Sequence, residues 1–337
     1  MEMGARAHRP TPARVEGVRA RRIAAGVWHV CALKPDGGVA CWGHNGWGQL
    51  GDGTRDDRST PVEVLGVQDV VSIAAGLGHS CARTADRELF CWGQNEHGQL
   101  GDGSVEDRTT PTRVDLDEVV SVVAGRAHTC ALRADGSVWC WGENLDGQLG
   151  DGTRSEPAGY RPTPARLPID GALELAAGPG ASCARTAREI LCWGRNDSMQ
   201  LAAGGGGRAD AAVLHPTPTR DAEGAVQIAL GSRFSCIRDE ASVRCRGLNH
   251  RGQLGDGSRR LRRRWTPVDA LIADDLAAGV EHACVLRAGE VLCWGDNRAG
   301  QLADPTLRFA PTPTPALRLT PSTETVTPAA ATPAAAP

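Results

Sequence analysis

Residues 74–82 read AAGLGHSCA, residues 91–103 read CWGQNEHGQLGDG, and Thr110-Pro111 closes the unit. The pattern recurs on anchor glycines spaced 48 to 53 residues apart, namely Gly26, Gly76, Gly125, Gly178, Gly231 and Gly279. Within each unit, short β-branched runs alternate with turn glycines, as in strands joined by tight turns. Repeats of about fifty residues with this composition indicate propeller blades more than helical solenoids.

The second unit contains four predicted strands, at residues 70–75, 79–83, 89–93 and 110–114. We therefore predict an all-β fold, a β-propeller of four-stranded blades, with six identifiable blades in a six- or seven-bladed ring. The predicted propeller covers residues 20–318, with blades at about 20–69, 70–119, 120–172, 173–225, 226–273 and 274–318. Residues 1–19 precede it and carry the sequence of a closing strand, RPTPARV at 9–15, whose own repeat is missing, so the chain is expected to be truncated at its start. Residues 319–337 are rich in Pro, Ala and Thr and are predicted to be a disordered tail.

Residues that recur from unit to unit are better explained by folding than by catalysis, which needs its groups only once. We predict that the blade tryptophans pack between neighbouring blades, namely Trp42, Trp92, Trp141, Trp193 and Trp294. The histidines that follow the anchor glycines are predicted to be structural rather than a ring of ligands or bases, namely His29, His79, His128 and His282.

All twelve cysteines fall into pairs nine or ten residues apart, on opposed positions of predicted hairpins. Opposed Cβ atoms come close enough for a disulfide, so we predict bridges within blades. The pairs are Cys31–Cys41, Cys81–Cys91, Cys130–Cys140, Cys183–Cys192, Cys236–Cys245 and Cys284–Cys293. Buried free thiols are the alternative, and zinc is disfavoured because no C-x-x-C completes a site.

Disulfides persist in oxidising compartments, so we expect an extracytoplasmic location, secreted or at the cell surface, although no signal peptide is visible; a cytoplasmic location is the alternative. No apolar run is long enough for a membrane span. The net charge of −3 gives no general attraction to nucleic acid. A single lysine against 36 arginines suggests a GC-rich, bacterial coding sequence.

The stretch GHSCA followed by FCWGQNEHGQLGDG, within residues 78–103, resembles the repeats of the regulator of chromosome condensation family in a bacterial, cysteine-paired form. The resemblance implies a β-propeller, usually seven-bladed in this family. It also implies a protein-binding role, since members include a nucleotide exchange factor for a small GTPase, photoreceptors, ubiquitin-ligase scaffolds and a bacterial inhibitor of secreted β-lactamases. Fold alone does not choose among these roles.

Units three to five depart most from the pattern. Arg246 replaces the blade tryptophan of unit five, Ala181 and Phe234 replace histidines, and residues 204–207 are a glycine run. The loops after the Gly-Asp-Gly turns carry arginines beside aromatic residues, a composition typical of interface hot spots. The predicted partner-binding residues are Tyr160, Arg161, Arg246, Arg259, Arg260, Arg262, Arg263, Arg264 and Trp265, with drift of the repeat or a solvated charge run as the alternative.

Sequence motifs for catalysis are missing: the chain has no G-x-x-x-x-G-K, G-x-S-x-G or H-E-x-x-H. The aspartates at residues 51–57 fit turn corners better than a calcium site, so neither a metal nor a cofactor is expected. We predict a monomeric, non-enzymatic scaffold that binds an unidentified protein, not nucleic acid, through loops on one propeller face. A guanine-nucleotide exchange factor and an inhibitor of a secreted enzyme are the alternatives.

Overall fold

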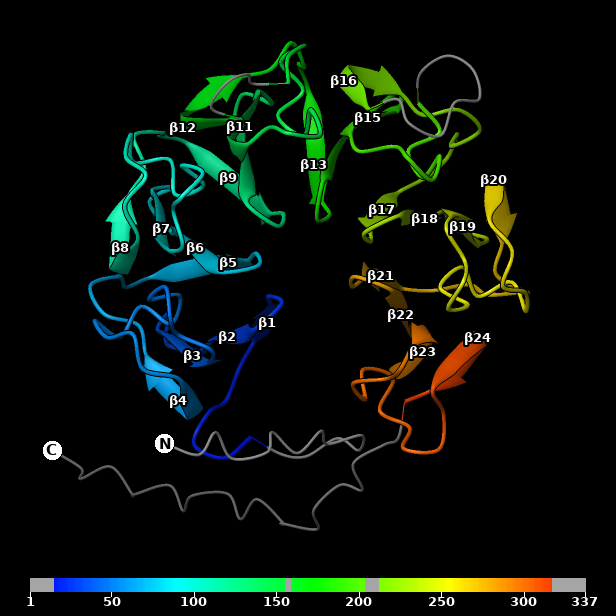
Figure 1. Ribbon diagram of the computed structural model, residues 1–337, viewed down its shortest axis with the longest axis horizontal. Helices are drawn as coiled ribbons and strands as arrows, with labels where there is room; N and C mark the ends of the chain where they lie inside the picture. The colour runs from blue at the N-terminus through cyan, green and yellow to red at the C-terminus, as the bar shows by residue number, and fades with distance from the viewer. Residues whose placement is uncertain (1–14, 155–158, 204–211, 317–337) are drawn as a thin grey trace, which may run out of the picture.

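Six antiparallel sheets of four strands each are arranged in a ring in the computed structural model, which describes residues 15–154, 159–203 and 212–316 (Figure 1). Within each sheet, consecutive strands pair in chain order from the centre outwards. This arrangement is a six-bladed β-propeller and confirms the predicted fold class. The predicted closing-strand remnant up to residue 14 and the predicted tail lie outside the described residues.

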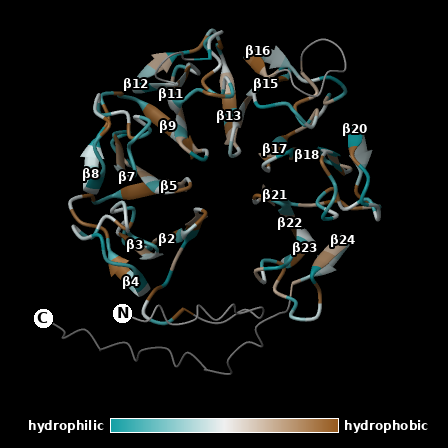
Figure 2. Ribbon diagram, in the orientation of Figure 1, coloured by the Kyte–Doolittle hydropathy of each residue, from teal (hydrophilic) through white to brown (hydrophobic). Residues whose placement is uncertain are grey.

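The innermost strand of each blade faces the ring centre and contacts the innermost strand of the next blade from blade 1 through blade 6. These strands are β1 (Arg22–Ala25), β5 (Val70–Ala75), β9 (Val119–Ala124), β13 (Ala172–Ala177), β17 (Gln227–Leu230) and β21 (Asp275–Ala278). Figure 2 shows that several of them, β5 and β9 among them, are among the more hydrophobic parts of the ring.

The two middle strands of each blade form the hairpin that carries the cysteines. The second strands are β2 (His29–Leu33), β6 (His79–Thr84), β10 (His128–Arg133), β14 (Ala181–Thr186), β18 (Phe234–Arg238) and β22 (His282–Arg287). The third strands are β3 (Val39–Gly43), β7 (Leu89–Gly93), β11 (Val138–Glu143), β15 (Ile190–Gly194), β19 (Val243–Gly247) and β23 (Glu290–Asp296). Each hairpin aligns its two cysteines directly opposite each other, with Cα atoms 4.1 to 4.2 Å apart, and all six predicted disulfides are present.

The outermost strands carry the prolines of the repeat. They are β4 (Arg58–Glu63), β8 (Arg108–Arg113), β12 (Tyr160–Arg166), β16 (Val213–Pro218), β20 (Arg262–Pro267) and β24 (Phe309–Pro315). Proline lacks an N–H donor and is therefore tolerated at a sheet edge.

The glycine of Cys-Trp-Gly is required by the backbone at the end of each third strand. Gly93 has a φ of +100°, and a Cβ placed on it would lie 2.4 Å from the carbonyl oxygen of Gly78. The register between the third and fourth strands shifts at this point. A residue with a side chain would therefore be strained here and would clash with the neighbouring turn.

Candidate protein-binding surface

The cavity at the ring centre is lined by apolar side chains of the innermost strands. Its lining includes Ala24, Ile73, Val122, Ala176 and Leu230, and none of its lining residues is titratable. The side chains that line this cavity therefore include neither a proton donor nor a metal ligand.

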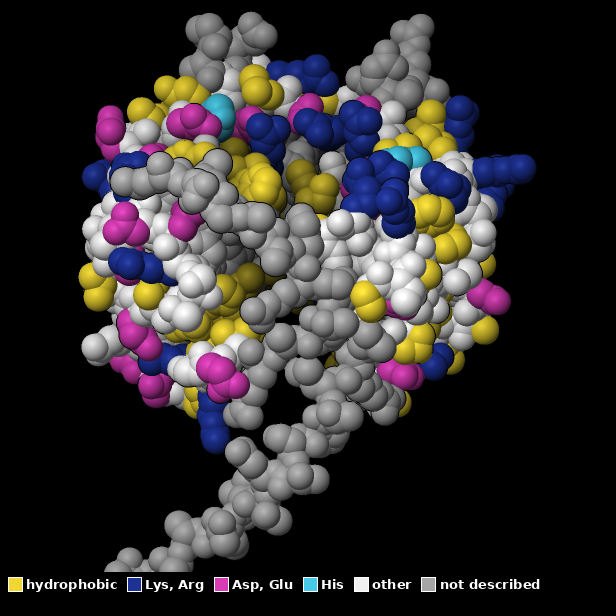
Figure 3. All heavy atoms as spheres, turned by 60° about the horizontal axis from the view of Figure 1, so that its bottom comes forward, with side chains coloured by type: hydrophobic (Ala, Val, Ile, Leu, Met, Phe, Trp, Pro, Cys, Tyr) yellow, Lys and Arg dark blue, Asp and Glu magenta, His cyan; other side chains and the backbone are white. Residues whose placement is uncertain are grey.

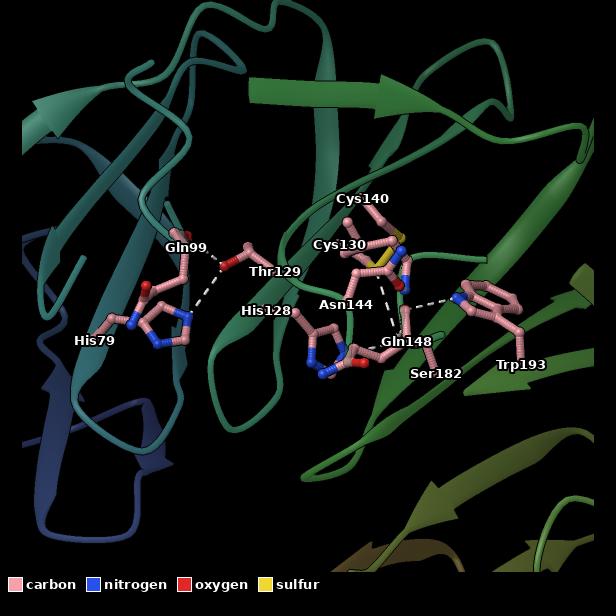
Figure 4. Close-up of a disulfide and its surroundings, with 11 residues drawn as sticks. His79, Gln99, His128, Thr129, Cys130, Cys140, Asn144, Gln148, Ser182 and Trp193 are labelled. Atoms are coloured by element: carbon pink, nitrogen blue, oxygen red, sulfur yellow. Dashed lines mark hydrogen bonds between the residues drawn. A yellow bond between two sulfur atoms is a disulfide. The ribbon is translucent and has the colours of Figure 1, made fainter. Parts of the chain in front are cut away.

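The recurrent histidines join neighbouring blades. The Nε2 atoms of His79 and His128 lie 3.0 Å from the Thr129 hydroxyl and 2.8 Å from the Ser182 hydroxyl, respectively (Figure 4). The Thr129 hydroxyl in turn donates to the carbonyl oxygen of Gln99, at 2.8 Å. Because that hydroxyl's proton is committed to the carbonyl, the histidine Nε2 carries the proton that it donates.

Burial keeps these histidines neutral. It lowers the pKa of His79 to about 3 and that of His128 to about 4. Burial, followed by the charge of His44, lowers the pKa of His29 to about 4. His29 makes the equivalent bond to Ser80, at 2.8 Å. The structural interpretation of the three histidines is therefore confirmed.

Four blade tryptophans pack against the preceding blade. The Trp92 indole is fully buried beside Leu50, and its Nε1 donates to the Gln49 carbonyl at 2.9 Å. Equivalent bonds join Trp141 to Gln99, Trp193 to Gln148 and Trp294 to Gln253. Trp42 is the exception to the predicted packing, because it lies half-buried in the first blade.

Arg246 replaces this tryptophan at the junction of blades 4 and 5. It is buried, and its Nε donates to the carbonyl of Met199, at 2.7 Å. Its guanidinium lies 5.5 Å from the ring centroid of Trp265, whose Nε1 donates to the Arg220 carbonyl of blade 4. Burial lowers the pKa of Arg246 to about 10, although the charge of Asp221 opposes the shift, so the side chain stays charged at neutral pH. Arg246 and Trp265, predicted to contact a partner, instead fill a blade junction.

Arg161 and Arg262 are also predicted to contact a partner. Each forms an ion pair with an aspartate of its own blade, and this arginine–aspartate pair recurs in the outer part of four blades. Arg262 Nε lies 2.6 Å from Asp256 Oδ2 and Arg161 Nη2 lies 2.7 Å from Asp151 Oδ2. The same pair joins Arg58 to Asp52 and Arg108 to Asp102. This pair is therefore a property of the repeat, found in blades 1, 2, 3 and 5.

Of the other four arginines of residues 259–264, Arg259 has a counterpart in Arg55, because each donates to a carbonyl nine residues earlier, whereas Arg260, Arg263 and Arg264 have none in the repeat pattern. Arg259, Arg260, Arg263 and Arg264 are exposed, and within the described residues no ion pair involves them. The guanidinium of Arg259 lies 4.6 Å from the ring centroid of Phe309 in blade 6. Figure 3 shows the largest gathering of Lys and Arg side chains on the side of the ring where Figure 1 places β17–β24.

The residues predicted to form one binding surface across units three to five lie in two separate places on the ring. Tyr160 and Arg161 begin β12, whereas Arg262 begins β20, on a different side of the ring (Figure 1). Tyr160 lies near His97 of blade 2, with ring centroids 6.5 Å apart. The glycine run at 204–207 lies outside the described residues. The residues that lie together are the arginines of residues 259–264, of which Arg259 and Arg260 lie in the loop before β20 and the others lie in β20, an edge strand.

The aspartates of the Gly-Asp-Gly turns hold the loops together. Asp52 Oδ1 accepts hydrogen bonds from Asn45 and from the Thr54 hydroxyl. Burial raises its pKa, but hydrogen bonds from Thr54, Arg58 and Asn45 outweigh that effect, and the net pKa lies below the ordinary value. Within the described ranges, no cluster of three or more metal-ligating side chains is present, and no helix has the length and hydropathy needed to cross a bilayer.

The fold places the chain in a class of repeat propellers whose central cavity is lined by apolar side chains. Hydrogen bonds from recurrent histidines and tryptophans join the neighbouring blades. Models of the regulator of chromosome condensation (RCC1) repeat match residues 36–83, 86–132 and 135–184, and a second such model matches residues 20–49, 70–99, 119–148 and 273–301. Together the matches cover more than half of the chain. The chain therefore belongs to the RCC1 repeat family.

Similar proteins come from plants, yeast and humans. A stretch of 60 residues is 42% identical to the mitochondrial RCC1 domain-containing protein RUG3 of Arabidopsis thaliana, covering 18% of this chain and only 13% of that relative's length. The crystal structure of Prp20p from Saccharomyces cerevisiae, a protein studied for binding to Gsp1p and histones, has a TM-score of 0.78 at 22% identity, over 88% of this chain and 76% of that one. The crystal structure of human WBSCR16 has a TM-score of 0.80 at 22% identity, over 92% and 84%. These structures share the fold.

Proposed function

We propose that the chain is a non-enzymatic scaffold that binds an acidic protein surface through Arg259, Arg260, Arg263 and Arg264, which we call the arginine row. The supporting observation is a difference between Arg262 and the arginines next to it in the sequence. Arg262 is paired with Asp256, whereas Arg260, Arg263 and Arg264 are exposed and have no counterpart in the repeat. Arginine forms paired hydrogen bonds with carboxylates and stacks on aromatic rings, so a row of arginines favours an acidic partner.

The proposal includes a place of action outside the cytoplasm. All six cysteine pairs are bridged in the structure, and such bridges persist in oxidising compartments. Alkylation of the protein in its own cells should leave the cysteines unmodified until a reductant is added. Modification of all twelve without reductant would place the protein in a reducing compartment instead.

Affinity capture comparing two variants tests the binding surface. The variant Arg260→Ala/Arg263→Ala/Arg264→Ala should lose the specific partner, because each change removes only an exposed charge. Arg108→Ala is the matched control, since it breaks the recurrent ion pair in blade 2 and leaves the arginine row intact. Equal capture of the same proteins by wild type and the triple variant would refute the proposed surface.

Nucleotide exchange is the competing function, and the purified chain can be assayed for it directly. The scaffold proposal expects no acceleration of fluorescent GDP release from the small GTPases of the host. Acceleration of about tenfold or more, retained in the triple arginine variant, would favour the exchange factor and locate its site elsewhere.

A further inference from the structure

Arg259 and its counterpart Arg55 are held in the same way by their own blades. Arg259 Nε donates to the carbonyl oxygen of His250, at 2.9 Å, and Arg55 Nη1 donates to that of Gly46, at 3.1 Å. Both carbonyls belong to the turn that follows the third strand of the blade. From this shared anchor, each arginine side chain reaches the next blade, blade 2 for Arg55 and blade 6 for Arg259.

The two arginines meet different residues on the next blade. Arg55 Nη1 lies 3.1 Å from Asp107 Oδ2, so a carboxylate of the ring itself neutralises its charge. The guanidinium of Arg259 lies over Phe309 instead, 4.6 Å from the ring centroid. Asp107 and Phe309 hold equivalent positions, because each directly precedes the residue that pairs with the glycine of Cys-Trp-Gly. An aromatic ring therefore stands in blade 6 where blade 2 has a carboxylate.

This replacement leaves the charge of Arg259 exposed while its side chain stays in place. An aromatic face attracts a guanidinium and does not use its N–H groups. Arg259 is exposed, and within the described ranges only the carbonyl of His250 accepts a hydrogen bond from it. Phe309 is partly buried at the start of β24, so the fold holds the ring. In the part of the chain that the structure describes, no contact of this kind holds the other three guanidinium groups of the arginine row.

We propose that Arg259, positioned by Phe309, is the member of the arginine row that selects a carboxylate of the partner, an inference that rests on the proposed function. Asp107 supplies a carboxylate to Arg55 within the ring, and an Asp or Glu side chain of the partner supplies it to Arg259 at the junction of blades 5 and 6. A guanidinium that stacking already holds loses little side-chain freedom when it forms two parallel hydrogen bonds with a carboxylate. The rest of the row adds attraction that depends on charge alone.

Lysine substitution separates the geometry of Arg259 from its charge. The probe is a fluorescein-labelled hexaglutamate peptide, whose dissociation constant for the full chain is measured by fluorescence anisotropy at about 150 mM salt. Arg259→Lys should weaken binding at least about fivefold, because an ammonium keeps the charge but cannot form the paired bonds or stack in the same way. Arg260→Lys is the matched control and should change binding by less than about twofold. Equal effects of the two substitutions would overturn the proposal.

A double-mutant cycle tests whether Phe309 acts through Arg259. Phe309→Leu should weaken binding of the same peptide about two- to fivefold, and Phe309→Tyr, which keeps an aromatic face, should bind as the wild type does. In the Arg259→Ala background, Phe309→Leu should have no further effect, because its only proposed contact with the site is gone. An equal loss with and without Arg259 would mean that Phe309 has a structural role alone and would contradict its role as a positioning residue.

The same titrations distinguish failure of this inference from failure of the proposed function. Loss of peptide binding in Arg260→Ala/Arg263→Ala/Arg264→Ala, together with wild-type binding in Arg259→Lys and Phe309→Leu, would refute the role of Arg259 and leave the arginine row as the binding surface. Absence of peptide binding by the wild-type chain would refute both.

Discussion

At the scale of single residues, the repeat separates side chains that build the ring from those that do not. His79 and His128 bind a hydroxyl of the next blade, and Trp92 binds a carbonyl of the preceding blade. These side chains lie within junctions, and their replacement should act on stability. Arg260, Arg263 and Arg264 lie on the surface, and their replacement should act on binding.

Acid should weaken the ring through its histidines. The native pKa values, about 3 for His79 and about 4 for His29 and His128, lie below the ordinary value of 6.5, so the unfolded chain binds protons that the folded ring excludes. The free energy of unfolding should therefore decrease as the pH falls from about 6.5 to about 4, by about 1.4 kcal/mol per pH unit for each histidine. Urea titrations at several pH values measure this slope.

His128→Phe is the matched control for that slope. Phenylalanine already occupies the equivalent position in blade 5, where the ring of Phe234 lies over Gly231 as the His128 ring lies over Gly125. The variant should fold. The dependence of its unfolding free energy on pH should be less steep than that of the wild type by about 1.4 kcal/mol per pH unit. A profile that is flat between pH 7 and pH 5 in both proteins would contradict the assignment of neutral, buried histidines.

Two equivalent tryptophans should differ in their importance for stability. Trp92→Ala removes a fully buried indole and should cost about 3 to 5 kcal/mol of unfolding free energy. Trp42→Ala removes a half-buried indole and should cost about 1 kcal/mol. Denaturant titrations of the two variants compare them directly, and equal losses would mean that blade 6 or another element covers Trp42.

At the scale of the blade, the disulfide hairpin is the element most directly predicted from the sequence. Opposed cysteines in an antiparallel hairpin follow from the position of the turn, which local residues set, so the strands and all six pairs could be inferred. The junction of blades 4 and 5 could not be inferred. Arg246 and Trp265 compensate each other across two strands, and the sequence alone presents them as a lost tryptophan and an exposed aromatic residue.

Removal of one disulfide should weaken its blade without abolishing the fold. Cys81→Ala/Cys91→Ala opens a loop of ten residues and should lower the free energy of unfolding by about 2 to 3 kcal/mol. Peptide mapping of the wild type without reduction should link Cys81 to Cys91 and to no other cysteine. Links between blades would contradict the pairing.

At the scale of the whole molecule, the ring has two irregular regions. One is the junction of blade 6 with blade 1, whose innermost strands lack, within the described residues, the contacts made by the other neighbouring blades, and the other is the arginine row on the outer side of blades 5 and 6. The sequence is compatible with six or seven blades, because ring closure depends on contacts between the first and last units. Composition indicates the arginine row, but its separation from Tyr160 depends on the position of each blade in the ring. Blade 4 stands between β12 and β20 (Figure 1).

The central claim is that the repeat builds the scaffold and the arginine row binds the partner. The dissociation constant of the captured partner for Arg260→Ala/Arg263→Ala/Arg264→Ala tests it most directly. We predict binding at least about tenfold weaker than wild type, with a salt dependence that is reduced and an unfolding midpoint that is unchanged, because exposed charges contribute little to stability. Wild-type affinity in the triple variant, at low and high salt alike, would contradict the claim.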